Sequence, residues 1–106
     1  MEITFATTDL RDMCEKEEAA GRILSLVAAE ALKHRMSDIR AADSIHEVLV
    51  GRPRVGDFNG KECFIIDLDE EFQLKVIAAH SKPPLRTDGS ADWEQIRRVK
   101  VVSLGK

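Results

Sequence analysis

The stretch that decides the fold is Cys63-Phe64-Ile65-Ile66-Asp67-Leu68-Asp69-Glu70-Glu71-Phe72-Gln73-Leu74-Lys75-Val76-Ile77-Ala78. Two apolar runs, 63–68 and 72–78, flank the polar connection 69–71, which predicts two antiparallel strands joined by a short turn. Side chains alternate between the faces of a strand, so one face of this hairpin is wholly apolar and is expected to face the core: Phe64, Ile66, Leu68, Phe72, Leu74 and Val76. The other face is mixed, as expected for a sheet face left partly open to water or ligand: Cys63, Ile65, Asp67, Gln73, Lys75 and Ile77.

The segments around the hairpin predict a two-layer α+β domain. Before it come a short strand at 3–5, a helix from Asp9 to about Glu18 and a longer helix from about Arg22 to Arg40. The glycine-rich segment 56–60 predicts a bend, and the proline-containing segment 81–92 predicts a loop. A last strand is expected at 97–104. The expected order is β-α-α-β-β-β, with two N-terminal helices on a small, mainly antiparallel sheet.

The longer helix carries a wide apolar face of the kind that covers a sheet. Its members are Ile23, Leu24, Val27, Ala28, Ala31, Leu32, Met36 and Ile39. Trp93 is expected to anchor the last strand to the core.

Length and composition limit the class of protein. The chain has 106 residues, which predicts a single domain spanning 1–106. No apolar run approaches the roughly 18 residues of a membrane span, and no signal peptide is recognisable at the first residues, so a cytoplasmic protein is expected. The net charge of −3 weighs against a dedicated nucleic-acid binder, which is usually basic.

The two cysteines, Cys14 and Cys63, are far apart in the sequence. Neither a Cys-x-x-Cys pair nor a cysteine–histidine cluster is present, so we expect two reduced thiols and no zinc site. No metal or other cofactor is predicted.

The second half of the chain carries an ordered series of motifs. Gly-Asp-x-x-Gly is followed by a strand ending in Asp-Leu, a turn, an aromatic-x-Leu segment, a proline-containing loop, Asp-Gly-x-x-Asp-Trp and a strand rich in valine and basic residues. In this sequence they are Gly56–Gly60, Ile65–Leu68, Phe72–Val76, Pro83–Leu85, Asp88–Trp93 and Arg97–Val102. Each motif alone is weak, but the ordered series resembles the RelE/ParE superfamily of bacterial toxins, and within it the HigB-like plasmid-maintenance (killer protein) branch.

The resemblance implies the toxin component of a type II toxin–antitoxin pair, neutralised by a cognate helix-turn-helix antitoxin. It further implies a ribosome-dependent mRNA endonuclease (mRNA interferase) that cleaves mRNA in the ribosomal A site without a metal. That reaction needs a base for the 2′-hydroxyl, cations for the charge that develops at phosphorus and an acid for the leaving oxygen. The mixed face of the sheet is expected to supply these groups.

The sequence departs from the family pattern where the chemistry is expected. Members of this branch often read Tyr-Arg-Leu in the aromatic-x-Leu segment; Gln73 replaces that arginine here, and an amide cannot neutralise a phosphate. Phe58 occupies the position of a basic residue that often follows Gly-Asp, and the terminal Asp-Tyr-His of this branch does not occur in the sequence.

Other polar residues around the mixed face are candidates for the missing roles. As catalytic residues we expect Arg54, Lys75 and His80, the last because neutral imidazole is a base near pH 7. As RNA-binding residues we expect Arg52, Lys61, Gln73, Arg98 and Lys100.

Two alternatives stay open at this stage. In the first, the chain is a toxin-fold protein without nuclease activity that serves as an antitoxin-binding or regulatory module. The glutamine at 73 and the acidic net charge favour this alternative. Alternatively, it is a ParE-like inhibitor of gyrase, which needs no catalytic residues. The oligomeric state is not predicted.

Overall fold

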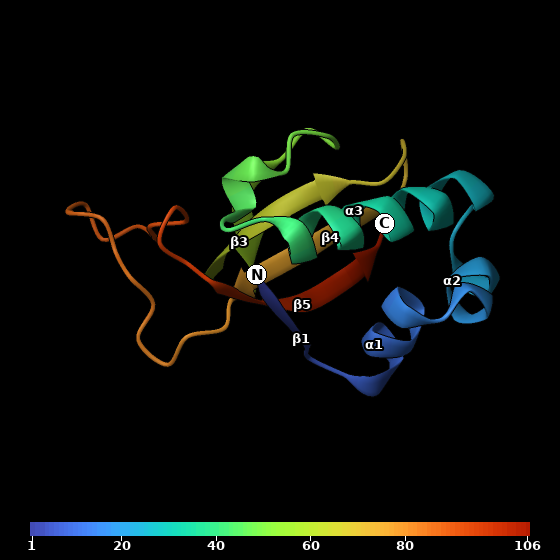
Figure 1. The fold of residues 1–106 in the computed structure, drawn as a ribbon, viewed down its shortest axis with the longest axis horizontal. Helices are drawn as coiled ribbons and strands as arrows, with labels where there is room; N and C mark the ends of the chain where they lie inside the picture. The colour runs from blue at the N-terminus through green and yellow to red at the C-terminus, as the bar shows by residue number, and fades with distance from the viewer.

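A computed structural model describes residues 1–106 and shows an α+β fold with three α-helices and a five-stranded mixed sheet (Figure 1). The elements are β1 (Glu2–Phe5), α1 (Thr8–Glu15), α2 (Glu17–Ile23), α3 (Leu26–Ala41), the 3₁₀ turn η1 (Ile45–Glu47), β2 (Arg54–Phe58), β3 (Lys61–Asp67), β4 (Gln73–Ala78) and β5 (Arg98–Gly105). The predicted α+β class is confirmed, with one more helix and one more strand than expected. None of the helices has the length and apolar character that a bilayer span requires.

The sheet has the strand order β1-β5-β4-β3-β2. β1 runs parallel to β5, and the other neighbours are antiparallel. In the β3–β4 hairpin Phe64 pairs with Val76 and Ile66 with Leu74, so these four apolar side chains share one face as predicted. The expected hairpin is therefore confirmed in position and register.

The helical segment is divided differently from the prediction. The chain breaks at Lys16 and again at Leu24–Ser25, giving three helices where two were expected. The second break is a helix N-cap, because the Ser25 hydroxyl accepts a hydrogen bond from the Ala28 N–H at 3.0 Å. Gly21 lies inside α2 and does not interrupt it.

This second break also changes which side chains face the core. Leu24, Leu32 and Met36 are buried as predicted. Ile23 and Val27, which the sequence places on the same apolar face, are exposed together with Leu26. A helix continuous from 22 to 40 would keep one rotational phase, whereas the extended residues Leu24 and Ser25 reset it.

The segment 56–60 is not simply a bend. Its first three residues belong to the edge strand β2, and the reversal is confined to Asn59 and Gly60, whose φ angles of 51° and 83° are left-handed. Gly56 lies inside the strand because the Ile65 side chain passes over it, 2.3 Å from where a Cβ would stand. The glycine that suggested a turn is there for this close approach.

The core lies between one face of the sheet and the helices, and α3 crosses in front of the sheet in Figure 1. The sheet contributes the predicted apolar face of the hairpin together with Val99 and Val101, and the helices contribute residues that include Met13, Leu32 and Ile39. No polar side chain is buried in it.

The segment 79–97 between β4 and β5 extends away from the sheet (Figure 1) and returns through Trp93. Trp93 is buried against Phe64 of β3, with ring centroids 5.3 Å apart, so it anchors the end of this loop to the core. Its indole N–H donates to Glu62 Oε2 at 2.7 Å, and the same carboxylate accepts the Ala91 N–H. Glu62 therefore ties the end of this long loop to β3.

Candidate nucleic-acid interface

The face of the sheet that no helix covers is called the open face here. Its central row follows from the strand register, because paired residues of neighbouring strands lie on the same face. Arg54 pairs with Ile65, Ile65 with Lys75, and Lys75 with Ser103. At about 4.8 Å per strand, the backbones of Arg54 and Lys75 are about 10 Å apart.

A second row lies next to the first. Ile77 pairs with Lys100, and Lys100 pairs with Thr4 across the parallel edge. Alternation along the strands adds the remaining candidates on this face, which are Lys61, Gln73 and Arg98. The open face is only partly accessible, since Cys63 and Ile77 on it are buried.

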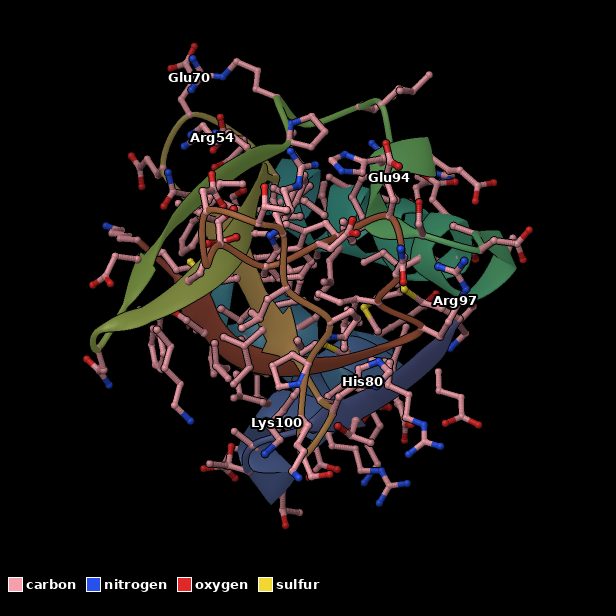
Figure 2. The ribbon with its side chains drawn as sticks, turned by 90° about the vertical axis from the view of Figure 1, so that its left-hand side faces the viewer. Arg54, Glu70, His80, Glu94, Arg97 and Lys100 are labelled. Carbon is pink, nitrogen blue, oxygen red and sulfur yellow. The ribbon has the colours of Figure 1, made fainter.

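Figure 2 shows Arg54 and Lys100 well separated across the molecule, in keeping with the three strand intervals from β2 to β5. The cations of the open face therefore form a broad field over four strands. Such a field suits an extended polyanion better than a small anion.

Asp67 gathers three of the candidate residues at one end of this field. Its carboxylate lies 2.6 Å from Arg52 Nη2 and 3.2 Å from Arg54 Nη2, and it accepts a hydrogen bond from the Gln73 amide at 3.2 Å. Only 11% of the Asp67 side chain is exposed, whereas the Arg52 side chain is 82% exposed. Two guanidinium groups thus carry a net charge of +1 with their shared carboxylate.

The pKa of Asp67 reflects this arrangement. Partial burial of the carboxyl raises its pKa, but hydrogen bonds and charges from Arg54 and Arg52 outweigh that effect and hold it below the usual value. Asp67 is therefore ionised at neutral pH and is a poor proton acceptor.

The backbone beside Asp67 is fixed by the turn at Gly51 and Arg52, whose φ angles are 96° and 48°. The Asp67 N–H donates to the Gly51 carbonyl at 2.6 Å. A Cβ on Gly51 would lie 2.6 Å from the Asp67 carbonyl oxygen, so only glycine fits at this approach. This turn brings Arg52 and Arg54 to the open face.

Three lysines of the open face have no ion pair or side-chain hydrogen bond: Lys61, Lys75 and Lys100. Lys75 is half-buried in the central row, and its positive charge lowers the pKa of Cys63, although burial of that thiol has the larger effect and the net shift is upward. Arg98, in contrast, pairs with Glu2 at 2.9 Å. Lys75 is thus the central cation whose charge remains available to a ligand.

His80 lies apart from the other candidates. It follows the end of β4 by two residues, and its Nε2 accepts a hydrogen bond from the Arg97 N–H at 3.2 Å. Figure 2 shows it at a distance from Arg54. The imidazole nitrogen expected to act as a base is therefore engaged with the backbone.

The sequence placed Gln73 and Lys75 on the face where they lie, but it did not indicate that Arg52, Arg54 and Gln73 converge on Asp67. The signal was present, because Asp67 and Gln73 alternate in phase with Lys75. The sequence did not predict strand β2, which positions Arg54 opposite Ile65, so the approach of Arg54 to Asp67 was not expected.

The open face carries charged side chains, but they are not arranged as the ligands of a metal ion. No three histidine, cysteine, aspartate or glutamate side chains are grouped so that they could hold a metal ion. No family model matches the chain, and neither a curated protein nor a solved structure does. What the surface can do chemically is bind phosphates and stabilise additional negative charge on one of them near Lys75.

Proposed function

We propose that the protein is the toxin of a type II toxin–antitoxin pair, acting on ribosome-bound mRNA through the open face. The observation that carries this proposal is the placement of Lys75, without a partner, between the cations of β2 and those of β5. An extended RNA strand crossing the sheet would place successive phosphates over this row. The motif series described above supports the same family.

The proposed reaction is transfer of the scissile phosphate within the RNA. The 2′-oxygen forms a bond to phosphorus while the bond from phosphorus to the 5′-oxygen breaks, leaving a 2′,3′-cyclic phosphate. Solvent water takes the proton of the 2′-hydroxyl and supplies the proton that the departing 5′-oxygen gains. Lys75 would stabilise the additional charge on the phosphate oxygens at the pentacoordinate transition state.

A second function, a toxin-fold protein that binds partners without cleaving RNA, is favoured by the state of the other candidates. Arg52, Arg54 and Gln73 are held by Asp67, and His80 is held by the backbone. This leaves no side chain of the open face arranged as a general base.

Induced expression in a bacterial host, with mapping of mRNA ends, tests the proposal. The wild-type protein should arrest growth and cut translated mRNA, and Lys75→Ala should lower the cleavage rate by about 100-fold, the effect of removing one group that stabilises transition-state charge. Lys33→Ala, which removes an exposed cation on the helical side, is the matched control and should cleave normally. Growth arrest with intact mRNA would contradict the nuclease function, and absence of arrest combined with tight partner binding would favour the second function.

A further inference from the structure

Three of the exposed large apolar side chains lie close together at the junction of α2 and α3. Ile23, Leu26 and Val27 are 59%, 84% and 67% exposed, and they fall within five consecutive residues. We call these three residues the α2–α3 corner. Large aliphatic side chains this exposed and this close together are typical of a surface that a partner covers.

The corner is held in place by a hydrogen-bonded connection to the β3–β4 turn. The Ser25 hydroxyl, which caps α3, also donates to Asp69 at 2.6 Å. Asp69 in turn accepts the N–H groups of Glu71 and Phe72 at 2.8 Å and 2.7 Å. The exposed side chains therefore lie beside a junction that hydrogen bonds fix between α3 and the β3–β4 turn.

Two hollows flank the aliphatic ridge, and both are lined by carboxylates. Val27 borders a hollow of about 410 Å³ shared with Ser25, Asp69, Glu70 and Glu71. Leu26 borders a hollow of about 220 Å³, whose charged residues are Glu17, Glu30 and Lys33.

The charge around the corner is predominantly negative. Lys33 is paired with Glu17 at 2.7 Å and Lys106 with Glu71 at 3.4 Å, so neither cation neutralises the remaining acids. Glu70 has no ion pair, and Figure 2 shows it projecting from the molecule. A complementary partner presents aliphatic side chains flanked by lysine or arginine.

We propose that the α2–α3 corner is the docking site for a helix of a partner protein, with aliphatic residues over Leu26 and Val27 and basic residues over Glu30 and Glu70. A helix fits because its side-chain rows seat in hollows on either side of a ridge. This inference rests on the proposed function for the identity of the partner, which is the antitoxin. A helix-turn-helix DNA-binding protein carries the basic residues that the rim requires.

The site lies on the helical side of the molecule, so docking there leaves the cations of the open face uncovered by the contact itself. The two surfaces can therefore be changed independently. Variants of the corner should keep the RNA cleavage rate of the wild-type protein.

Titration calorimetry against the product of the adjacent reading frame, which the proposed function expects to be a helix-turn-helix protein, tests this proposal. Leu26→Ala and Glu70→Lys should each weaken the complex at least tenfold, as truncation or charge reversal at the centre of an interface does. Leu85→Ala, an equally simple truncation of an exposed leucine in the loop 79–97, should bind like the wild-type protein. Circular dichroism of each variant checks that the fold is retained.

The outcomes separate this inference from the proposed function. Wild-type binding that both corner variants leave unchanged would overturn the docking site while the toxin–antitoxin assignment stands. Failure of the wild-type protein to bind the neighbouring gene product would overturn the assignment of the partner, and with it the docking site.

Discussion

The open face and the α2–α3 corner differ in the kind of partner that their side chains suit. The open face is a broad sheet surface with partner-free lysines and with Arg52 and Arg54 held by Asp67. The corner is a compact aliphatic ridge with a carboxylate rim. A net charge of −3 thus conceals two surfaces of opposite character, which is why the overall charge is a poor guide to what this chain binds.

The largest expected effect comes from contrasting two leucines of α3. Leu32 is buried in the core and Leu26 is exposed at the corner. Leu32→Ala should lower the free energy of unfolding by about 2–5 kcal/mol, because it leaves a cavity. Leu26→Ala should change it by less than about 0.5 kcal/mol, as measured by urea denaturation. Equal losses would show that Leu26 belongs to the core and would remove the corner as a separate surface.

Loss of the α3 cap should have the next largest effect on stability. Ser25→Ala removes the hydrogen bonds to the Ala28 N–H and to Asp69, at a cost of about 1 kcal/mol in unfolding free energy. Ser37→Ala, at an exposed position within α3, is the matched control and should be nearly neutral. If the two variants are equally stable, the junction does not hold the corner in place.

The cations of the open face should be visible in the salt dependence of RNA binding. Each of Lys75→Ala and Lys100→Ala should reduce the slope of log affinity against log salt by about 0.7 for single-stranded RNA, because one fewer counterion is released. Lys33→Ala should leave the slope unchanged. Affinities from fluorescence anisotropy at several salt concentrations provide the slopes, and identical slopes for all four proteins would place the RNA elsewhere.

The smallest expected effect is on acid stability. The lowered pKa of Asp67 means that its pairing stabilises the folded state above the ordinary carboxyl pKa of about 3.9 and that this contribution is lost as the pH falls through the lowered value. Asp67→Asn should therefore lose less unfolding free energy than the wild-type protein below about pH 4. Parallel acid profiles would show that the carboxylate is not stabilised by Arg52 and Arg54.

Local patterns were sufficient to predict the hairpin, because strict alternation leaves only one register that buries Phe64, Ile66 and Leu74 together. Local patterns were insufficient where the same residue type can occupy two different structural positions. Gly56 suggested a turn but allows Ile65 to approach the strand, and Ser25 interrupts a helical pattern that appeared continuous.

The candidate sites were also predictable from the sequence only where local alternation decides them. Alternation placed Lys75 and Gln73 on one face, and the register confirms that placement, whereas the pairing of Ile77 with Lys100 is what puts Lys100 there. The ion pairs of Asp67 depend on the turn at Gly51 and on β2, which are tertiary features. Leu26 and Val27 are exposed because the extended residue Ser25 changes the rotational phase between α2 and α3. The hydrophobic periodicity of the whole segment does not show that change.

Chemical-shift mapping of the isotope-labelled protein with a single-stranded RNA oligonucleotide shows directly whether RNA binds across the open face. Binding across the open face should produce the largest amide shifts at Lys61, Lys75 and Lys100 and leave the amides of α3 unchanged. Shifts confined to α2 and α3, or none at RNA concentrations that saturate binding, would contradict it.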